Sequence, residues 1–345
     1  MNHSIYFPPE WAHQSAIQIT WPHMNTDWGY MLEESVACFA NIAHEILKRQ
    51  DLIIICNSQA GVRYRLGDET AWKGKLTLVE IPTNDTWNRD HGGISVFIDG
   101  NPCIYDFMFN GWGLKFAAAK DNQINRRLFE KKAFNPAVKW IDKKNFVLEG
   151  GAIETDGKGT LLTTSQCLLS PNRNSYLSKE EVEAYLKDVF GLDRVLWLDY
   201  GYLIGDDTDS HIDTLARFCD EHTIAYVKCD DPNDKHYTEL LKMEEQLKEF
   251  KDYKGKPYKL IPLPMAAPAF DNSNERLPAT YANFLIMNDT VLMPVYGKKE
   301  KDNQAIEQLK PAFPDKEIVG VNCSALIKQH GSLHCVTMQF PEGFL

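Results

Sequence analysis

Carboxylates, a histidine and a cysteine stand at the head of strand-like apolar runs in this chain, beside glycines or small polar residues. They are Asp90 in WNRDHGG, Glu149 in FVLEGG, His211 and Asp213 in DSHIDTLARF, and Cys335 in HGSLHC. A carboxylate among apolar residues is costly to bury without a cation or a hydrogen-bond donor. The two-residue spacing predicts that His211 and Asp213 point to one face of a strand.

Brought together, these side chains could act on a planar cation. Two carboxylates can hold a guanidinium through bidentate, charge-assisted hydrogen bonds. The Cys335 thiolate could then attack the central carbon, while His211 protonates the leaving amine and later activates water. The third carboxylate would orient the histidine, as the third member of a catalytic triad does.

Each of these residues also has a purely structural interpretation. Asp90 could cap a turn, Glu149 could reach solvent from a strand edge, and a lone histidine or cysteine is more often structural than catalytic. A metal site built from Cys335, His334 and His330 is a further alternative. The sequence lacks HExxH and CxxC spacings, a GxSxG elbow, a Walker A motif and GxGxxG, so we do not expect a metal site.

Helices that alternate with short strands must position these residues. Amphipathic periodicity and N-cap residues predict five helices, at about 30–49, 121–134, 178–190, 234–250 and 301–312. Ser178 and Glu181 have the spacing of a capping box. Between the helices lie the β-rich runs LIIICN, KLTLVEIP, VLWLDY, KLIPLP and EIVGVN.

A hairpin-like pattern recurs along the chain, at 13–22, 92–107, 150–169, 210–229, 280–297 and, shortened, 331–340. Each full hairpin is followed by a helix and a strand, and the last stretch could pair with the first. The repeat predicts a ring of five ββαβ units, with a generic α/β protein as the alternative. In a ring, the residues that lead the hairpins would converge: Asp90, Glu149, His211, Tyr281 and a position near Gly331.

Composition narrows the class of partner. Hydrophobic residues make up 43% of the 345 residues, and the net charge is −11, which indicates a globular chain and disfavours nucleic acid or an anionic membrane. No run approaches the roughly 18 apolar residues that span a bilayer. The N-terminal MNHSIYFPPEW does not have the pattern of a secretory signal, and eight cysteines without CxxC pairs suit a reducing compartment. We therefore expect a cytoplasmic protein with a small cationic partner.

The chain resembles the agmatine deiminase family, also known as the bacterial-type peptidylarginine deiminase family, of the guanidino-group-modifying (pentein) superfamily. The matching motifs are PPEW, ITWPH, TWNRDHGG, FNGWG, LEGGAIETDGKGTLLTTSQCLLSPNRN, DSHID and GSLHC. They extend from residue 8 to residue 335. The resemblance implies an α/β pentein fold, a five-bladed pseudo-symmetric propeller of ββαβ units, with residues 1–345 as a single catalytic domain.

The resemblance also implies a cofactor-free hydrolysis, in which agmatine gives N-carbamoylputrescine and ammonia during putrescine biosynthesis. Cys335 would be the nucleophile that forms a thiouronium intermediate, and His211 the general acid and base. Asp90 and Asp213 would bind the guanidinium, and Glu149 would hydrogen-bond His211. A bound guanidinium and a protonated histidine would stabilise the thiolate.

The far end of the substrate is less well defined. An ammonium would prefer an acidic or aromatic subsite, for which Trp87, Trp112, Asp206 and Asp209 are candidates. A carboxylate would need an arginine, and the motif blocks offer Arg89 and Arg173.

Two departures from the family pattern lie near this region. His330 and Ser332 replace the more usual small or amide residues before His334-Cys335, and FNGWG stands where FNAWG is more common. Arginine or peptidyl-arginine as substrate, amidino transfer to an amine, and a silent guanidino-binding protein remain alternatives. The sequence leaves open whether the chain forms a homo-oligomer.

Overall fold

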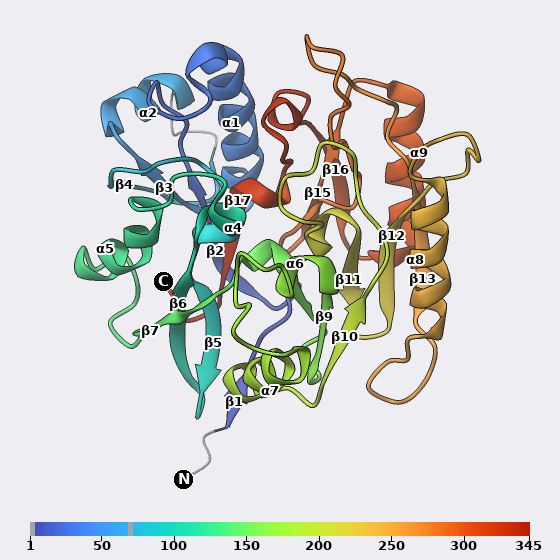
Figure 1. Ribbon diagram of the computed structural model, residues 1–345. Helices are drawn as coiled ribbons and strands as arrows, with labels where there is room; N and C mark the ends of the chain where they lie inside the picture. The colour runs from blue at the N-terminus through green and yellow to red at the C-terminus, as the bar shows by residue number, and fades with distance from the viewer. Residues whose placement is uncertain (1–3, 68–71) are drawn as a thin grey trace.

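The computed structural model describes residues 4–67 and 72–345, so residues 1–3, part of the segment considered for a secretory signal, lie outside it. The strands of the described residues form five sheets (Figure 1). Two sheets have four strands, β1(Ile5–Tyr6)-β5(Ile94–Ile98)-β6(Asn101–Met108)-β7(Lys139–Val147) and β17(Thr337–Pro341)-β2(Gln14–Thr20)-β3(Asp51–Cys56)-β4(Leu76–Glu80). Three sheets have three strands, β10(Arg194–Leu198)-β9(Thr160–Thr164)-β8(Ile153–Thr155), β11(Ala216–Asp220)-β12(Thr223–Lys228)-β13(Lys259–Pro264) and β14(Leu285–Ile286)-β15(Thr290–Val295)-β16(Glu317–Asn322).

The sheets share one pairing pattern. In each, a first strand pairs antiparallel with a second, and the second pairs in parallel with a third. The fifth unit is completed by strands from both ends of the chain, since β17 pairs antiparallel with β2 and Thr337 lies opposite Ile19. The predicted five-bladed α/β propeller of ββαβ units, with the last stretch joining the first, is confirmed.

A helix connects the second and third strands of each blade, because parallel strands need a crossover. The five expected helices are α1 (Leu32–Leu47), α5 (Ile124–Glu130), α7 (Lys179–Phe190), α8 (Tyr237–Glu249) and α9 (Lys299–Leu309). Figure 1 shows them outside the strands. Among the described helices, none is long and apolar enough to cross a membrane.

The helix boundaries follow the capping chemistry. Ser178 caps α7 and forms the predicted capping box with Glu181. The expected helix at 121–134 is shorter, because a 3-10 turn, η3 (Asp121–Gln123), precedes α5. Asp121 is not an N-cap: its carboxylate accepts hydrogen bonds from the backbone N–H groups of Asn84 and Asp85.

Apolar side chains fill the space between each helix and its sheet. On α1, the buried residues recur at helical spacing and belong to the same core as Ile17 of β2 and Ile54 of β3: Val36, Phe39, Ala43, Ile46 and Leu47. The predicted β-rich run KLIPLP is confirmed by β13, whose Leu263 is fully buried. This packing holds the inner ends of the blades in fixed positions.

Short helical turns precede the first strands of four blades. They are α3 (Asn88–His91), η4 (Gly150–Ala152), η5 (Ile212–Thr214) and η8 (His334–Val336). The prediction that His211 and Asp213 share a face of a strand is wrong, since Asp213 lies within η5 and β11 begins at Ala216. Cys335 likewise belongs to η8 rather than to β17. A tight turn can aim side chains at the ring centre, where a strand would send them to alternate faces.

Candidate active site

The turns at the heads of the blades meet at the centre of the ring and bring the five candidate residues together. Asp90 lies in α3, Glu149 precedes η4, His211 and Asp213 belong to η5 and its N-terminus, and Cys335 lies in η8. The turn α3 packs on both η4 and η8, and η4 packs on η5. All five side chains are buried. The predicted convergence is therefore seen, although the roles of these residues stay predictions.

Two hydrogen bonds, one to each oxygen, fix the carboxylate of Asp90. Trp112 Nε1 donates to Oδ2 at 2.9 Å, and the backbone N–H of Gly151 donates to Oδ1 at 3.0 Å. Gly151 is needed here, because a Cβ at this position would lie 2.6 Å from His211 Nδ1 and 2.8 Å from Asp90 Oδ1. Burial raises the pKa of Asp90 to about 6, and a cation bound beside it would favour its ionised form.

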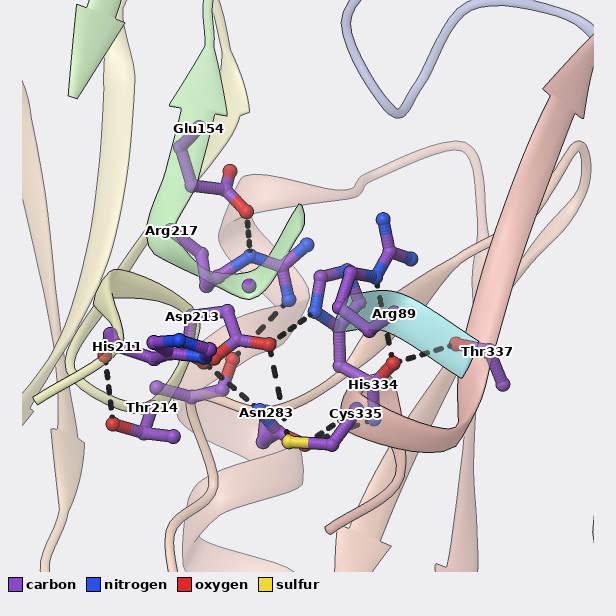
Figure 2. A network of polar contacts seen from close by, with 12 residues as sticks. Arg89, Glu154, His211, Asp213, Thr214, Arg217, Asn283, His334, Cys335 and Thr337 are labelled. Atoms are coloured by element: carbon purple, nitrogen blue, oxygen red, sulfur yellow. Dashed lines mark hydrogen bonds and ion pairs between the residues drawn. The ribbon is translucent and has the colours of Figure 1, made fainter. Parts of the chain in front are cut away.

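Asp213 is held by the residue that precedes Cys335. His334 Nδ1 lies 2.7 Å from Asp213 Oδ2, and Cys335 Sγ lies 3.9 Å from the same oxygen (Figure 2). Burial would raise the pKa of Asp213, but the hydrogen bond and charge of His334 lower it below its ordinary value. The other oxygen, Oδ1, is buried and has no hydrogen-bond partner among the described residues. It is free to accept one from a ligand.

The thiol of Cys335 is fixed by an amide that the sequence analysis did not single out. Asn283 Oδ1 accepts from the backbone N–H of His334 at 2.9 Å and of Cys335 at 3.3 Å, and lies 3.4 Å from Cys335 Sγ. Burial, together with the charges of Asp213 and Asp90, raises the pKa of Cys335 well above its ordinary value. Without a bound cation, Cys335 is therefore a thiol.

The imidazole of His211 lies beside Asp90, with Nδ1 3.5 Å from Asp90 Oδ1. Burial would lower its pKa, but the charges of Asp90, Cys167 and Glu149 raise it well above the ordinary value. Neither ring nitrogen has a hydrogen-bond partner among the described residues. A protonated imidazole here would therefore have an N–H group available for a ligand.

The expected hydrogen bond between Glu149 and His211 is not formed. Both of its oxygens accept from Arg173 Nε, at 3.1 and 3.0 Å, and it makes no hydrogen bond to His211. The buried carboxylate needs a full positive charge beside it, and Arg173 supplies that charge. Glu149 still contributes to the raised pKa of His211 through its charge.

A cavity leads to Cys335. Its lining includes Asp90 and both predicted tryptophans, Trp87 and Trp112. Trp87 and Trp112 pack edge to face, with ring centroids 6.5 Å apart. The faces of such rings attract cations.

Two aspartates predicted to bind the far end of the substrate, Asp209 and Asp206, make other contacts instead. Asp209 pairs with Arg173 at 2.6 Å and with Lys115 at 2.8 Å, and it does not line the cavity. Asp206 accepts hydrogen bonds from Thr208 and Ser210 within its own loop. The sequence offered several aspartates in GDDTDS without showing which one faces inward.

Three other aspartates line the cavity: Asp27, Asp85 and Asp207. Burial and the charges of Asp27 and Asp121 raise the pKa of Asp85 to about 7. Burial and the charge of Asp206 raise the pKa of Asp207 to about 6. Asp85 stands two residues before Trp87, which was the one sequence signal that could have identified it.

The two arginines considered for a carboxylate ligand do not reach this cavity. Arg173 is bound to Glu149, to Asp209 and to the carbonyl of Thr208. Arg89 is buried, and its Nε donates to the carbonyl of His334 at 3.5 Å. Figure 2 shows its guanidinium on the far side of His334 from Cys335.

A buried charge network extends from Asp213 away from the cavity. His334 Nε2 lies 2.8 Å from Glu10 Oε2, and Arg217 pairs with both Glu10 and Glu154. Glu10 belongs to the PPEW motif, which the sequence analysis used only for the resemblance. Tyr281, expected to lead its hairpin, instead donates to Asp302 at 2.7 Å. Asn283 occupies the position at the ring centre.

Two clusters have ligand types that could hold a metal ion, Glu149–Cys167–His211 and Glu10–Glu154–His334. Arginines occupy the carboxylates of both, Arg173 in the first and Arg217 in the second. A buried guanidinium beside each carboxylate competes with a metal ion. The alternative set of Cys335, His334 and His330 is also disfavoured, because both ring nitrogens of His334 face carboxylates.

The two departures from the family pattern have structural correlates. Gly111 of FNGWG has a positive φ of 68°, and a Cβ there would lie 2.1 Å from the carbonyl oxygen of Phe116, so an alanine requires a different loop. Ser332 Oγ lies 2.8 Å from Tyr296 Oη. His330 lines the cavity and contacts the carbonyl of Gly205 through Nδ1 at 2.7 Å.

Comparison with known proteins places this site among guanidine-modifying enzymes. Residues 6–341 match the family described as Porphyromonas-type peptidyl-arginine deiminase. A Porphyromonas gingivalis crystal structure, provisionally named an arginine deiminase, has a TM-score of 0.94 and 53% identity over 99% of both chains. A cysteine-to-serine variant of C. jejuni agmatine deiminase with substrate bound has a TM-score of 0.91 and 38% identity over 99% of this chain and 98% of that chain. Agmatine deiminase from Stutzerimonas stutzeri is 30% identical over 99% of this chain and 96% of that protein.

Proposed function

The chain belongs to the Porphyromonas-type peptidyl-arginine deiminase family, which includes agmatine deiminases of the pentein fold, and we propose that it hydrolyses agmatine to N-carbamoylputrescine and ammonia. As a member, it is a hydrolase that acts on the C–N bonds of guanidino compounds. The proposal concerns the substrate, the product and the covalent intermediate. The product would enter putrescine formation.

The lining of the cavity carries the choice of substrate. Agmatine has a guanidinium at one end and an ammonium at the other. Besides Asp90 near Cys335, the lining holds Asp27, Asp85 and Asp207, while no lysine or arginine of the described residues lines it. Acidic and aromatic walls attract an ammonium and repel a carboxylate.

The first half of the reaction forms a bond to sulfur. The guanidinium would lie between Asp90 and Asp213, whose carboxylates accept its N–H groups. Its positive charge offsets the two negative charges that raise the pKa of Cys335, which favours the thiolate. The thiolate attacks the guanidinium carbon, His211 gives its proton to the departing nitrogen, and ammonia leaves a thiouronium on Cys335.

The second half uses the same groups in reverse. His211, now neutral, takes a proton from water, and the hydroxide attacks the thiouronium carbon. The carbon–sulfur bond breaks with its electron pair on Cys335, the hydroxyl proton passes to the departing sulfur or to solvent, and the neutral ureido product leaves. Asp213, aligned by His334, and Asp90, aligned by Trp112 and Gly151, hold the carbon in place through both steps.

Arginine is the second candidate substrate. The relative with 53% identity is provisionally named an arginine deiminase, and His330 lies in the cavity lining. The three lining aspartates of the outer cavity oppose this assignment, because they would surround the carboxylate of arginine with negative charge.

The deciding experiment compares agmatine, arginine and a blocked arginine peptide at equal concentration, with ammonia and the ureido product both quantified. We expect agmatine to have the highest kcat/KM, by at least tenfold. Cys335→Ala protein, purified in parallel, measures contaminating activity. Turnover of arginine or of the peptide without turnover of agmatine would disprove the proposed substrate, and transfer of the amidino group to an added amine would identify a transferase.

We propose that the reaction takes place in the cytoplasm. All eight cysteines are free and buried, and thiols persist in a reducing compartment. Cell fractionation followed by immunoblotting tests this location, and detection in the extracellular or membrane fraction would contradict it.

A further inference from the structure

A second pocket lies beyond the buried charge network and outside the cavity that leads to Cys335. The first strands of three blades, β5, β8 and β17, line it together with the N-terminal segment that contains Phe7 and Glu10. Apolar side chains form much of its wall: Phe7, Pro8, Ile94, Ile153, Met338 and Pro341. The two cavities share no lining residue, so they are separate sites.

Arg89 is the distinctive polar group of this pocket. Its side chain is 96% buried, yet it forms no ion pair with a described carboxylate, and its Nη2 has no hydrogen-bond partner there. Its remaining nitrogens make weak contacts at 3.5 Å, from Nε to the carbonyl oxygen of His334 and from Nη1 to the sulfur of Met338. A buried guanidinium without a strong partner is costly, so a ligand that supplies an anion would be stabilised.

The two glutamates that line the same pocket already accept hydrogen bonds from other residues. Glu10 accepts from Arg217, His334 and the backbone N–H of Ile286. Glu154 accepts from Arg217 and the backbone N–H of Phe218. Burial lowers the pKa of Arg89, whereas the charges of Glu10, Asp213 and Glu154 still favour its charged form and act to raise that pKa, but none of these described carboxylates makes a hydrogen bond to it. The pocket therefore presents N–H donors of Arg89 beside an apolar wall.

A second unpartnered group lies in the same wall. The hydroxyl of Ser95 on β5 is buried and has no hydrogen-bond partner among the described residues. Like Nη2 of Arg89, this hydroxyl can donate to a ligand in the pocket that both residues line. Glu10 and Glu154 would repel a multiply charged anion such as phosphate, whereas a single negative charge on an apolar body suits both the guanidinium and the walls.

We propose that this pocket binds a small monocarboxylate, with its carboxylate on Arg89 and Ser95 and its apolar body against Phe7, Ile94 and Ile153. The inference does not depend on the proposed substrate of the Cys335 site. It concerns a separate ligand on the opposite side of His334, as Figure 2 shows for the guanidinium of Arg89.

Butyrate is the probe, with butyramide as its uncharged counterpart and sodium chloride as the ionic-strength control. A ligand that binds only the native state raises the midpoint of thermal unfolding. We expect butyrate to raise it and butyramide and chloride to leave it unchanged. Equilibrium dialysis with labelled butyrate then gives the affinity, which Arg89→Met should weaken about tenfold or more.

Two further variants make the test decisive. Cys335→Ala should bind butyrate like the wild type, because its cavity is separate. Ser95→Val removes the hydroxyl and narrows the pocket, and it replaces Arg89→Met as the deciding variant if the latter does not fold. Absence of butyrate binding to the wild type, equal binding of butyramide, or unchanged binding in folded Arg89→Met or Ser95→Val protein would overturn the proposal.

Discussion

His334 Nδ1 lies 2.7 Å from Asp213 Oδ2, and this contact joins the residue before the proposed nucleophile to the carboxylate proposed to hold the guanidinium. The other ring nitrogen of His334 faces Glu10 at 2.8 Å. One imidazole thus fixes the orientation of Asp213 from the side opposite the cavity. Because His334 and Cys335 are adjacent in the sequence, this contact couples the position of the proposed nucleophile to that of the proposed guanidinium-binding carboxylate.

His334→Gln tests this positioning. Glutamine can reach one of the two carboxylates but not both, so Asp213 should lose its alignment. We expect kcat/KM for agmatine to fall roughly 10- to 100-fold with a raised KM, measured by steady-state ammonia release. His236→Gln is the matched control, because His236 is also buried and bonded to an aspartate, Asp234, but lies outside the site. Equal losses in both variants would mean that His334 acts only through stability.

Cys335→Ala tests the nucleophile. The substitution removes the sulfur that would carry the thiouronium, so turnover should fall by roughly 10³-fold or more while agmatine still binds. Intact-protein mass spectrometry after acid quenching should detect an adduct in the wild type and none in the variant. Cys167→Ala is the control, since this second buried cysteine lies near His211 and should leave the adduct in place. Activity above a tenth of the wild type in Cys335→Ala would rule out the assignment.

Asp207→Asn tests the acidic end of the cavity. Asparagine keeps the shape of the side chain but removes the charge opposite the ammonium, so KM for agmatine should rise about tenfold at pH 8 with little change in kcat. The exposed Asp315→Asn controls for a general change of charge. An unchanged KM in Asp207→Asn would show that the ammonium lies elsewhere.

Sequence reasoning predicted the ring because its signals are local and repeated. Hairpins and amphipathic helices recur along the chain, and they and the Ser178–Glu181 capping box lie at the expected positions. It also identified residues that converge at the centre, such as Asp90 and Cys335, because chemically unusual side chains precede apolar strands. What it placed wrongly was the local geometry, since a three-residue turn such as η5 has no periodicity to detect.

The partners of the site were harder to predict, because they depend on contacts between distant blades. Arg173 takes the carboxylate of Glu149, which leaves His211 without the expected hydrogen bond. Asn283 comes from the blade whose leading residue was expected to be Tyr281. An asparagine in a loop has no distinctive sequence pattern, and only the assembled ring brings its amide to Cys335.

The pKa of Asp85 predicts how stability depends on pH. Burial and neighbouring acids raise that pKa to about 7, whereas an unfolded aspartate titrates near pH 4. Between about pH 4 and pH 7 the native state therefore holds a proton that the unfolded state releases, and the free energy of unfolding should fall as the pH rises.

Asp85→Asn should remove up to about 1.4 kcal/mol per pH unit of this slope. Urea unfolding at pH 5, 6, 7 and 8 measures the effect, and Asp315→Asn should retain the slope of the wild type. If the slopes of Asp85→Asn and the wild type coincide, Asp85 is ionised across this range.

Asn283 predicts a separation between thiol chemistry and substrate binding. Its Oδ1 meets the backbone N–H groups of His334 and Cys335 and lies 3.4 Å from the sulfur, so Asn283→Ala should loosen the thiol without touching the acidic cavity. We expect kcat to fall about 10- to 100-fold with KM nearly unchanged. Asn283→Asp should instead add a negative charge beside a thiol whose pKa is already raised. We expect the pH–rate profile of Asn283→Asp to shift to higher pH. Asn288→Ala is the control, because it removes an amide bonded to the backbone of Gln14 outside the site, and its profile should not shift. A parallel rise of KM in Asn283→Ala would instead assign this amide to substrate binding.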